Sequence, residues 1–328
     1  MTEEVNLVEE TKHNIKDEFG PNAAVTLGRE SDKLLSDVPG YISTQCTGID
    51  YAIGRLGIPL GRISEVFGWE ATGKTLLGIQ LMKECQRLGG VSVMIDSEQA
   101  IDRAWVEKLG LDLSTRVLFL QPDTLEETLG MIENVSKTIK EAKADVPVVI
   151  IWDSLPASKP EAEIKGEYGS GALGLTARLM SKSLSRLKNV LAKEKIALVI
   201  INQYREKIGI TFGDSRTTPG GKALKFYASL RIELSVSKQL ETSGKIVGIR
   251  GKAYVRKNKV AMPFGRAEYN LFFEKGIDNA SSILPIAVEQ EMVEKKGGWY
   301  FIGDKKFRKG NFGKYIGDIE KKIREELK

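Results

Sequence analysis

A short segment rich in small residues, Gly68–Thr75, has the spacing of a phosphate-binding loop. Its letters GWEATGKT match G-x-x-x-x-G-K-[ST], a pattern in which backbone N–H groups curl around a phosphate chain. Lys74 would reach the outer phosphates, and the Thr75 hydroxyl would ligate Mg²⁺. The alternative is a glycine turn beside a surface lysine. The residues expected to bind a nucleotide here are Gly68, Glu70, Ala71, Thr72, Gly73, Lys74 and Thr75.

Two carboxylates follow apolar runs elsewhere in the chain. Asp153 ends the run VVIIWD, and Glu98 lies in IDSEQA just after the run Val91–Ile95. A carboxylate at a strand end can hold Mg²⁺ directly or through water, so Thr75 and Asp153 are the candidate metal ligands. A carboxylate near the last phosphate can orient or deprotonate an attacking water, the role expected of Glu98. The alternatives are a turn or capping residue for Asp153 and a helix N-terminal carboxylate for Glu98.

These residues must be positioned by regular elements, and the hydrophobic pattern indicates which ones. Short β-branched runs alternate with longer amphipathic segments over about 170 residues. In one such segment, between Gly174 and Lys193, apolar residues recur at helical spacing. The alternation predicts a doubly wound α/β sheet whose ligands lie beyond the carboxyl ends of the strands. The predicted parallel strands are residues 63–67, 91–95, 117–120, 148–152 and 197–201.

The two ends of the chain have different patterns. Val8, Ile15 and Phe19 form a helical stripe too thin to fold alone, so this segment needs a partner surface. After Ser229 an alternating apolar pattern predicts further strands, antiparallel ones included. A last amphipathic helix completes a small lobe that we expect to start at about residue 277.

Charge is unevenly distributed along the chain. Lys and Arg total 49 against 44 Asp and Glu, a net charge of +5. Residues 241–328 hold 19 basic and 12 acidic residues, which leaves 30 and 32 for residues 1–240. The last quarter, at +7, could therefore meet a polyanion, without any implication of sequence-specific recognition. A length of 328 residues allows about two domains.

Composition also excludes several kinds of site. The single histidine, His13, excludes a His-based triad and a two-His metal site within the chain. Cys46 and Cys85 lie far apart with no CxxC pair, which argues against a zinc module and a disulfide framework. The start of the chain is acidic, and no apolar run approaches the roughly 18 residues of a membrane span. We therefore expect a cytoplasmic protein with no zinc and no membrane partner.

In order and spacing, the motifs closely resemble those of the RecA recombinase family. The resemblance extends from about Ile15 to beyond Gly298. It favours the bacterial and phage type, because the leader is too short for the N-terminal DNA-binding domain of archaeal and eukaryotic relatives and the extra lobe is C-terminal. The matching segments are Gly61–Thr75, IDSEQA, QPDT, VVIIWDS, Ile201–Gln203 and Thr217–Arg231.

The resemblance implies a fold and a division of the chain. The fold is a RecA-like P-loop ATPase core, a doubly wound and mostly parallel α/β sheet, with a short N-terminal helical segment and a small α+β C-terminal lobe. The expected boundaries place subunit packing in residues 1–40, the ATPase core with its DNA-binding loops in 41–276, and the C-terminal domain in 277–328. The implied cofactors are ATP and Mg²⁺.

The resemblance also assigns nucleotide contacts. Gln203 matches the residue that senses the γ-phosphate; its alternative is a buried amide bonded to backbone. Trp105, with Asp102 in the same DRAWVEKLG segment, falls where the family stacks a tyrosine on adenine; a core or surface aromatic is the alternative. Lys257 and Lys259 match lysines that reach the ATP of the adjacent subunit, and would otherwise belong to a solvated strand. The expected catalytic set is Lys74, Glu98, Gln203, Lys257 and Lys259.

DNA contacts carry over to two glycine-containing loops, residues 163–174 and 204–221. Leu173 and Ile208 stand where the family inserts apolar wedges between bases, and Arg178 matches a phosphate-binding arginine. Such contacts hold a strand with little sequence preference, because phosphates supply affinity without identifying bases. The alternative is a pair of mobile glycine loops. The other expected DNA contacts are Gly174, Arg205, Lys207, Thr217, Gly220, Gly221 and Lys222.

Some features depart from the family pattern. Trp69 replaces the usual proline of the phosphate loop. Glu206 and Ser185 occupy positions where the family has an apolar and a basic DNA-facing residue, although Arg186 can compensate for the second. An acidic C-terminal tail is missing, so duplex DNA should bind more readily if that tail restrains access in relatives.

The function implied by the resemblance is ATP-dependent homologous recombination. ATP and Mg²⁺ between adjacent subunits would stabilise a helical filament on single-stranded DNA. The filament would pair that strand with homologous double-stranded DNA and exchange strands, and hydrolysis promoted by Glu98 would reset it. The N-terminal helix and Phe226 are the implied packing surfaces. The alternatives are a ring-forming helicase or other motor on the same core, and a scaffold polymer in which ATP is only a switch.

Overall fold

The structure is a computed structural model of the chain and describes residues 2–20, 23–25, 37–166, 174–206 and 216–328. The chain forms two compact units, residues 1–39 and 40–328. In the first unit the helix α1 spans Thr2–Phe19, as the apolar stripe predicts. Val8 and Phe19 are exposed on this helix. None of the helices in the described part of the chain is long and apolar enough to cross a membrane.

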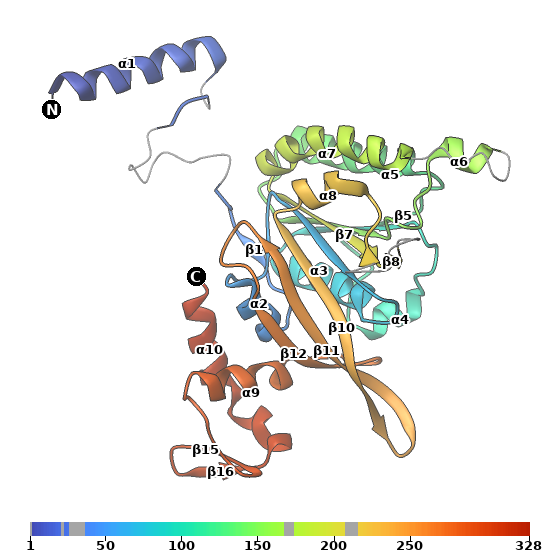
Figure 1. Cartoon of the computed structure of the whole chain (residues 1–328), viewed down its shortest axis with the longest axis vertical. Helices are drawn as coiled ribbons and strands as arrows, with labels where there is room; N and C mark the ends of the chain where they lie inside the picture. The colour runs from blue at the N-terminus through green and yellow to red at the C-terminus, as the bar shows by residue number, and fades with distance from the viewer. Residues whose placement is uncertain (1, 21–22, 26–36, 167–173, 207–215) are drawn as a thin grey trace. The chain divides into compact units, whose positions relative to one another are not determined.

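In the described residues of the second unit, nine strands form one mixed sheet (Figure 1). Its order is β13-β12-β11-β10-β3-β7-β6-β4-β5. Neighbours from β10 to β5 run parallel, and those from β10 to β13 run antiparallel. The predicted doubly wound, mostly parallel α/β sheet is therefore confirmed. The strands are Ile63–Gly68 (β3), Val91–Asp96 (β4), Val117–Leu120 (β5), Val148–Asp153 (β6), Ile196–Gln203 (β7), Leu230–Thr242 (β10), Lys245–Asn258 (β11), Arg266–Phe272 (β12) and Gly276–Asp278 (β13).

Helices cover both faces of the parallel part of the sheet. Side chains alternate along β6, so Val149 and Ile151 join one apolar core, while Val148, Ile150 and Trp152 join the other. Strands covered on both faces read as continuous apolar runs, which explains the pattern in the sequence. On the first face lie Lys74–Arg87 (α3) and Arg103–Lys108 (α4), with Thr47–Ile53 (α2) beside them against β11 and β12, and on the second lie Leu125–Ala142 (α5), Leu175–Lys193 (α7) and Gly221–Tyr227 (α8).

The parallel strands bring distant parts of the sequence to one edge of the sheet. Gly68 at the end of β3 pairs with Gln203 at the end of β7, and Asp96 at the end of β4 pairs with Asp153 at the end of β6. Parallel strands deliver ligand-binding residues to their shared carboxyl edge. The sequence candidates on these strands therefore lie near one another.

Short elements complete the description. Two pairs of two-residue strands lie outside the large sheet, and the second pair brackets one of the expected DNA loops. The C-terminal lobe has its own apolar core. These elements are Tyr41–Ile42 (β1), Ile58–Pro59 (β2), Glu161–Lys165 (α6), Arg205–Glu206 (β8), Arg216–Thr217 (β9), Asn279–Glu289 (α9), Glu294–Lys296 (β14), Trp299–Ile302 (β15), Lys305–Phe307 (β16), the 3₁₀ helix Lys309–Tyr315 and Ile316–Glu326 (α10).

An ion pair connects the last helix, α10, to α2. Arg324 on α10 lies 3.3 Å from a carboxylate oxygen of Asp50 on α2, which is completely buried. Burial raises the pKa of Asp50, and hydrogen bonds from Ser43 and Thr44 together with the charge of Arg324 oppose that rise. The arginine thus helps to keep a buried carboxylate ionised.

Arg324→Ala is expected to lower the free energy of unfolding by about 2–3 kcal/mol. Asp50 would keep its hydroxyl partners but lose its countercharge, which places the loss below that of a fully unpaired buried charge. Urea denaturation measures the change. Lys321→Ala, at an exposed position of the same helix, is the matched control and should stay within about 0.5 kcal/mol of the parent. An equal loss of unfolding free energy in the two variants would contradict a stabilising ion pair between Arg324 and Asp50.

Candidate functional site

The predicted phosphate loop connects the end of β3 to the start of α3, so the expected strand and helix flank it. Gly73 has a φ of +87°, and a Cβ there would lie 2.5 Å from Leu271 Cδ1. The backbone conformation therefore favours glycine at this position, and a Cβ would also displace the end of the Leu271 side chain. Ala71, with a φ of +55°, also turns the backbone in the left-handed region. The loop places several main-chain N–H groups at the N-terminus of α3, which favours an anion.

Lys74 is 7% exposed and lies inside this loop. Its Nζ donates a hydrogen bond to the main-chain oxygen of Trp69 at 2.7 Å and lies 3.5 Å from Thr72 Oγ1. Burial lowers the pKa of Lys74, while the charges of Asp153, Glu98 and Glu70 oppose that shift. The ammonium has N–H groups to offer to phosphate oxygens.

Thr75 and Asp153, the two expected metal ligands, are in direct contact. Thr75 Oγ1 donates to Asp153 Oδ2 at 2.5 Å. Burial raises the pKa of Asp153 to about 6; Thr75 and Lys74 act against the rise, and Glu98 and Asp96 add to it. Mg²⁺ prefers oxygen ligands and commonly binds to proteins through one or two side chains, keeping its waters. The hydroxyl and carboxylate oxygens fit that ion.

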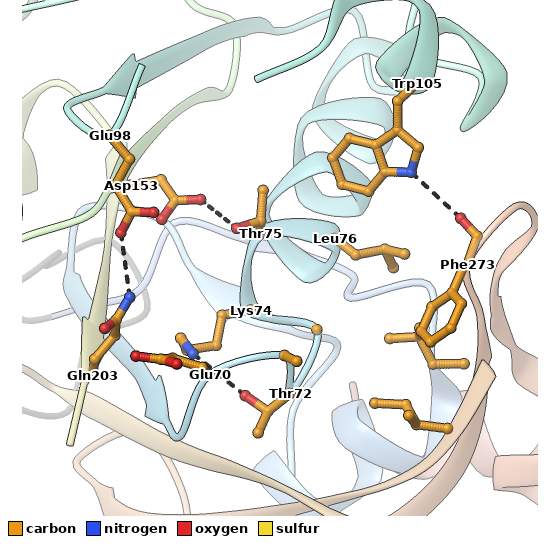
Figure 2. A pocket seen from close by; sticks show the side chains of 14 residues that line it. Glu70, Thr72, Lys74, Thr75, Leu76, Glu98, Trp105, Asp153, Gln203 and Phe273 are labelled. Atoms are coloured by element: carbon orange, nitrogen blue, oxygen red, sulfur yellow. Dashed lines mark hydrogen bonds between the residues drawn. The ribbon is translucent and has the colours of Figure 1, made fainter. Parts of the chain in front are cut away.

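Glu98 is held at one end of the pocket by two side chains. Its Oε1 accepts a hydrogen bond from Ser154 Oγ at 2.5 Å. The same oxygen accepts one from Gln203 Nε2 at 3.3 Å (Figure 2). The structure thus places Glu98, Asp153 and Gln203 together, as their positions after neighbouring strands suggest. Ser154 was not among the sequence candidates, although its place directly after Asp153 puts it at the same strand end.

Trp105 lies at the opposite end of the pocket from Glu98 and Gln203 (Figure 2). Its indole N–H donates to the main-chain oxygen of Phe273 at 3.4 Å. The half-buried ring also packs against the apolar core, as expected if Trp105 is a core aromatic residue, the alternative to stacking on adenine. The cavity holds about 450 Å³ and is lined by Glu70, Ala71, Thr72, Gly73, Lys74, Thr75, Leu76, Glu98, Trp105, Asp153, Gln203, Ile249, Leu271 and Phe273.

Two of the expected nucleotide contacts lie outside this lining. The carboxylate of Asp102 accepts a hydrogen bond from the main-chain N–H of Trp105 at 2.7 Å and so caps the N-terminus of α4. Gly68 ends β3, where its oxygen accepts a hydrogen bond from the Tyr204 N–H. The apolar wall made by Ile249, Leu271 and Phe273 was missed because no local motif marks it; it depends on the pairing of β11 with β12.

Lys257 and Lys259 also lie away from the pocket of their own subunit. Lys257 Nζ donates to the main-chain oxygens of Lys225 at 2.6 Å and Phe226 at 2.9 Å, at the end of α8. Lys259 Nζ lies 5.5 Å from the centroid of the exposed Phe226 ring. Burial, together with the charges of Lys259 and Arg231, lowers the pKa of Lys257 to about 8.

Comparison with known proteins settles the family. A family model described as the RecA N-terminal domain matches residues 6–278. This chain belongs to the RecA family. The RecA protein of Symbiobacterium thermophilum is 38% identical over 95% of this chain and 90% of its own length, and that of Thermus aquaticus is 41% identical over 92% and 86%. The RecA protein of Lactobacillus acidophilus is 40% identical over 96% of this chain and 85% of its own length.

Membership in the RecA family gives the chain a function in homologous recombination and DNA repair. The match covers the nucleotide site and both expected DNA loops, because it extends through residue 278. Nothing in these comparisons favours the ring helicase or the scaffold polymer. The family is also one of nucleotide-binding proteins, which agrees with the phosphate loop.

The expected RecA DNA contacts are only partly within the described residues; Leu173, Lys207 and Ile208 lie outside them. Gly174 and Gly220, with φ values of +80° and +90°, directly precede α7 and α8. A Cβ on Gly221 would lie 3.0 Å from Ala177 Cβ, so the ends of the two loops adjoin. Thr217 pairs with Arg205 in the β8–β9 ladder. Among the described members of the set, the exposed basic residues are Arg178, Arg205 and Lys222.

A buried amide connects the nucleotide site to the second of these RecA loops. Asn202, next to Gln203 on β7, donates from Nδ2 to Glu65 Oε1 at 2.9 Å and to the main-chain oxygen of Pro219 at 3.0 Å. The Gln203 N–H donates to Asn202 Oδ1 at 2.9 Å. Arg231 forms an ion pair with the same Glu65 carboxylate. A continuous chain of hydrogen bonds therefore joins the backbone of Gln203 to residue 219.

Proposed function

We propose that this member of the RecA family is a DNA-dependent ATPase that polymerises on single-stranded DNA and exchanges strands with homologous double-stranded DNA. The main support for this proposal is the arrangement of side chains around Glu98. One carboxylate is held by Ser154 and Gln203 at the end of a pocket that also contains Lys74 and the Thr75–Asp153 pair. Phosphoryl transfer depends on positioning and charge stabilisation more than on covalent help, and these residues supply both.

The side chains take separate parts in hydrolysis. Lys74 and the loop N–H groups bind the phosphates, and Thr75 and Asp153 would hold Mg²⁺. The ion supplies positive charge against the phosphate oxygens. Glu98 orients a water and accepts its proton, and Ser154 fixes the direction of that carboxylate.

Gln203 couples hydrolysis to DNA binding in this proposal. Its amide donates to Glu98 at 3.3 Å, and a γ-phosphate oxygen is a competing, more strongly charged acceptor. A change of partner at Gln203 would move the residues that follow it, which begin the second DNA loop. Support comes from the hydrogen bonds through Asn202 to Pro219.

Lys257 and Lys259 are assigned to the neighbouring subunit's nucleotide. They do not line their own pocket, and Lys257 is held at the end of α8 by the main-chain oxygens of Lys225 and Phe226. Burial, together with repulsion from Lys259 and Arg231, lowers the pKa of Lys257, and an incoming phosphate chain would relieve the repulsion. A cation supplied by another subunit can stabilise the transition state of phosphoryl transfer.

A mixing experiment tests this assignment. Lys257→Ala and Lys74→Ala should each abolish ATP hydrolysis alone, whereas a 1:1 mixture should recover about one quarter of the parent rate. In a random mixed polymer, about one quarter of the seams combine an intact loop from one subunit with an intact Lys257 from the next. Steady-state hydrolysis on single-stranded DNA is the measurement. A mixture no more active than either variant would contradict action between subunits.

The three segments expected from the sequence have separate tasks in this proposal. Residues 1–40 pack against an adjacent subunit, residues 41–276 bind nucleotide and DNA, and residues 277–328 form a separate domain. The assignment of residues 277–328 to their own domain is supported by an apolar core that includes Ile283, Phe307 and Ile323. The exposed apolar residues on α1 agree with subunit packing.

Two measurements test the proposed function. ATP hydrolysis should rise when single-stranded DNA is added, and a rate indifferent to DNA would favour the scaffold polymer. Homologous oligonucleotides should then exchange strands in the presence of ATP and Mg²⁺. Unwinding without preference for homology would favour the helicase instead.

A further inference from the structure

Trp69 lies in the phosphate loop, where its main-chain oxygen binds the same ammonium that a phosphate would attract. Its main-chain oxygen accepts from Lys74 Nζ at 2.7 Å and from Thr72 Oγ1 at 2.9 Å. Phosphate oxygens are charged and therefore compete strongly with a neutral carbonyl for the Lys74 ammonium. Arrival of a nucleotide would thus redistribute the bonds to the Trp69 carbonyl.

The Trp69 side chain reaches the first residue of the second DNA loop. Its ring centroid lies 5.5 Å from that of Tyr204, at an interplanar angle of 48°. Tyr204 also lies edge-on to Phe67, with centroids 5.5 Å apart, and its N–H donates to the Gly68 oxygen. Aromatic pairs at this separation stabilise a structure beyond the area that they bury. The end of β3 and the start of the phosphate loop therefore hold Tyr204 in place.

Tyr204 is in contact with the far end of the same loop. Arg205–Glu206 pairs with Arg216–Thr217, and the Arg216 guanidinium lies 5.0 Å from the Tyr204 ring centroid. Arg216 also lies 3.9 Å from a carboxylate oxygen of Glu233. Burial and a hydrogen bond to Glu233 raise the pKa of Tyr204, so the phenol stays protonated. Both ends of the loop thus meet at one aromatic ring.

We propose that Trp69 and Tyr204 are a positioning pair that transmits nucleotide binding in the phosphate loop to the base of the second DNA loop. The main-chain oxygen of Trp69 binds Lys74, and the ring of Tyr204 lies at both ends of the second DNA loop. Contact between the two rings therefore connects the phosphate loop to the base of the DNA loop. Nucleotide would fix that base and so raise the affinity for single-stranded DNA, in addition to the route through Gln203. The inference rests on the proposed function, which places DNA contacts on this loop.

The test compares the affinity for single-stranded DNA with and without a nonhydrolysable ATP analogue. A fluorescently labelled oligothymidylate and the full chain are used, with anisotropy as the readout. Trp69→Ala should reduce the ratio of the two affinities by about 3- to 10-fold, the effect of losing one aromatic pair. Binding of a labelled nucleotide without DNA should change by less than about twofold.

Conservative and double variants distinguish the loss of this aromatic contact from a general loss of structure. Trp69→Phe keeps a ring and should restore most of the ratio. Tyr204→Ala should reduce the ratio as Trp69→Ala does, and the double variant should lose no more than the larger single change, since the two residues act through one contact. Should Tyr204→Ala fail to fold, the cycle is completed with Tyr204→Leu. Phe119→Ala, at a 38% exposed ring on the edge strand β5, is the matched control and should keep the parent ratio.

Each further outcome overturns the proposal. An unchanged ratio in Trp69→Ala would show that the pair transmits nothing. An equal loss of affinity with and without the analogue would show a local structural role only. A parent ratio of one would overturn the proposed function, and the pair with it, because nucleotide would then not control DNA binding at all.

Discussion

Lys74→Ala is expected to reduce ATP hydrolysis by at least about 10²–10³-fold and to abolish strand exchange, while the protein stays folded. The ammonium is buried in the phosphate loop, with N–H groups available to the phosphates. Removing it deletes the positive charge that developing negative charge on the phosphates requires. Hydrolysis and oligonucleotide exchange are measured on the same preparation.

The fold of that variant is checked separately. Within the described residues, the hydrogen bonds of the Lys74 side chain go to two loop oxygens, the Trp69 carbonyl and the Thr72 hydroxyl, so urea denaturation should remain cooperative. Lys137→Ala, at a 73% exposed lysine on α5, is the control for loss of one positive charge and should keep the parent rate. A Lys74→Ala protein with more than about a tenth of the parent rate would contradict the assignment.

Glu98→Gln is expected to lower ATP hydrolysis by about 10²–10⁴-fold without preventing nucleotide binding. The glutamine can still accept the hydrogen bond from Ser154 but cannot take a proton from water. Because hydrolysis resets the filament in our account, this variant should form filaments that dissociate slowly after excess competitor DNA is added. Single-turnover hydrolysis and DNA release are the two measurements.

The outcome for Glu98→Gln separates a catalytic role from a structural one. Glu107→Gln, an exposed glutamate on α4, changes the same charge and should behave as the parent. Loss of nucleotide binding together with hydrolysis would indicate that Glu98 only shapes the pocket. A parent-like hydrolysis rate would remove Glu98 from the chemistry.

The parallel strands could be predicted because their sequences are buried on both faces. Residues 148–152 form one uninterrupted apolar run, and the structure extends that strand only to Asp153. The phosphate loop could also be predicted from the sequence, because its motif and the strand and helix that flank it are contiguous in the chain. Asp153 followed from the rule that parallel strands deliver polar residues to one edge, whereas Gln203 was assigned only through the family resemblance.

Other parts of the site depend on contacts that sequence pattern does not encode. Phe273 reaches the pocket through the pairing of β11 with β12, which is a matter of long-range register. Asp102 was expected to touch nucleotide, yet its carboxylate caps α4, a use that any Asp before a helix can have. The direction of Glu98 is set by Ser154 and Gln203, from two other strand ends.

The roles of Lys257 and Lys259 came from the resemblance alone. In a single chain they contact α8 and Phe226, and nothing in their spacing points to a nucleotide. In the proposed assembly, a second subunit would bring its phosphates to these two lysines.

Electron microscopy with single-stranded DNA tests that assembly most directly. In the presence of Mg²⁺ and a nonhydrolysable ATP analogue, the protein should form regular helical filaments along the DNA, and omitting the nucleotide should leave the DNA sparsely covered. Equal coverage without nucleotide, or isolated monomers in its presence, would contradict the claim that nucleotide held between subunits is what stabilises this polymer.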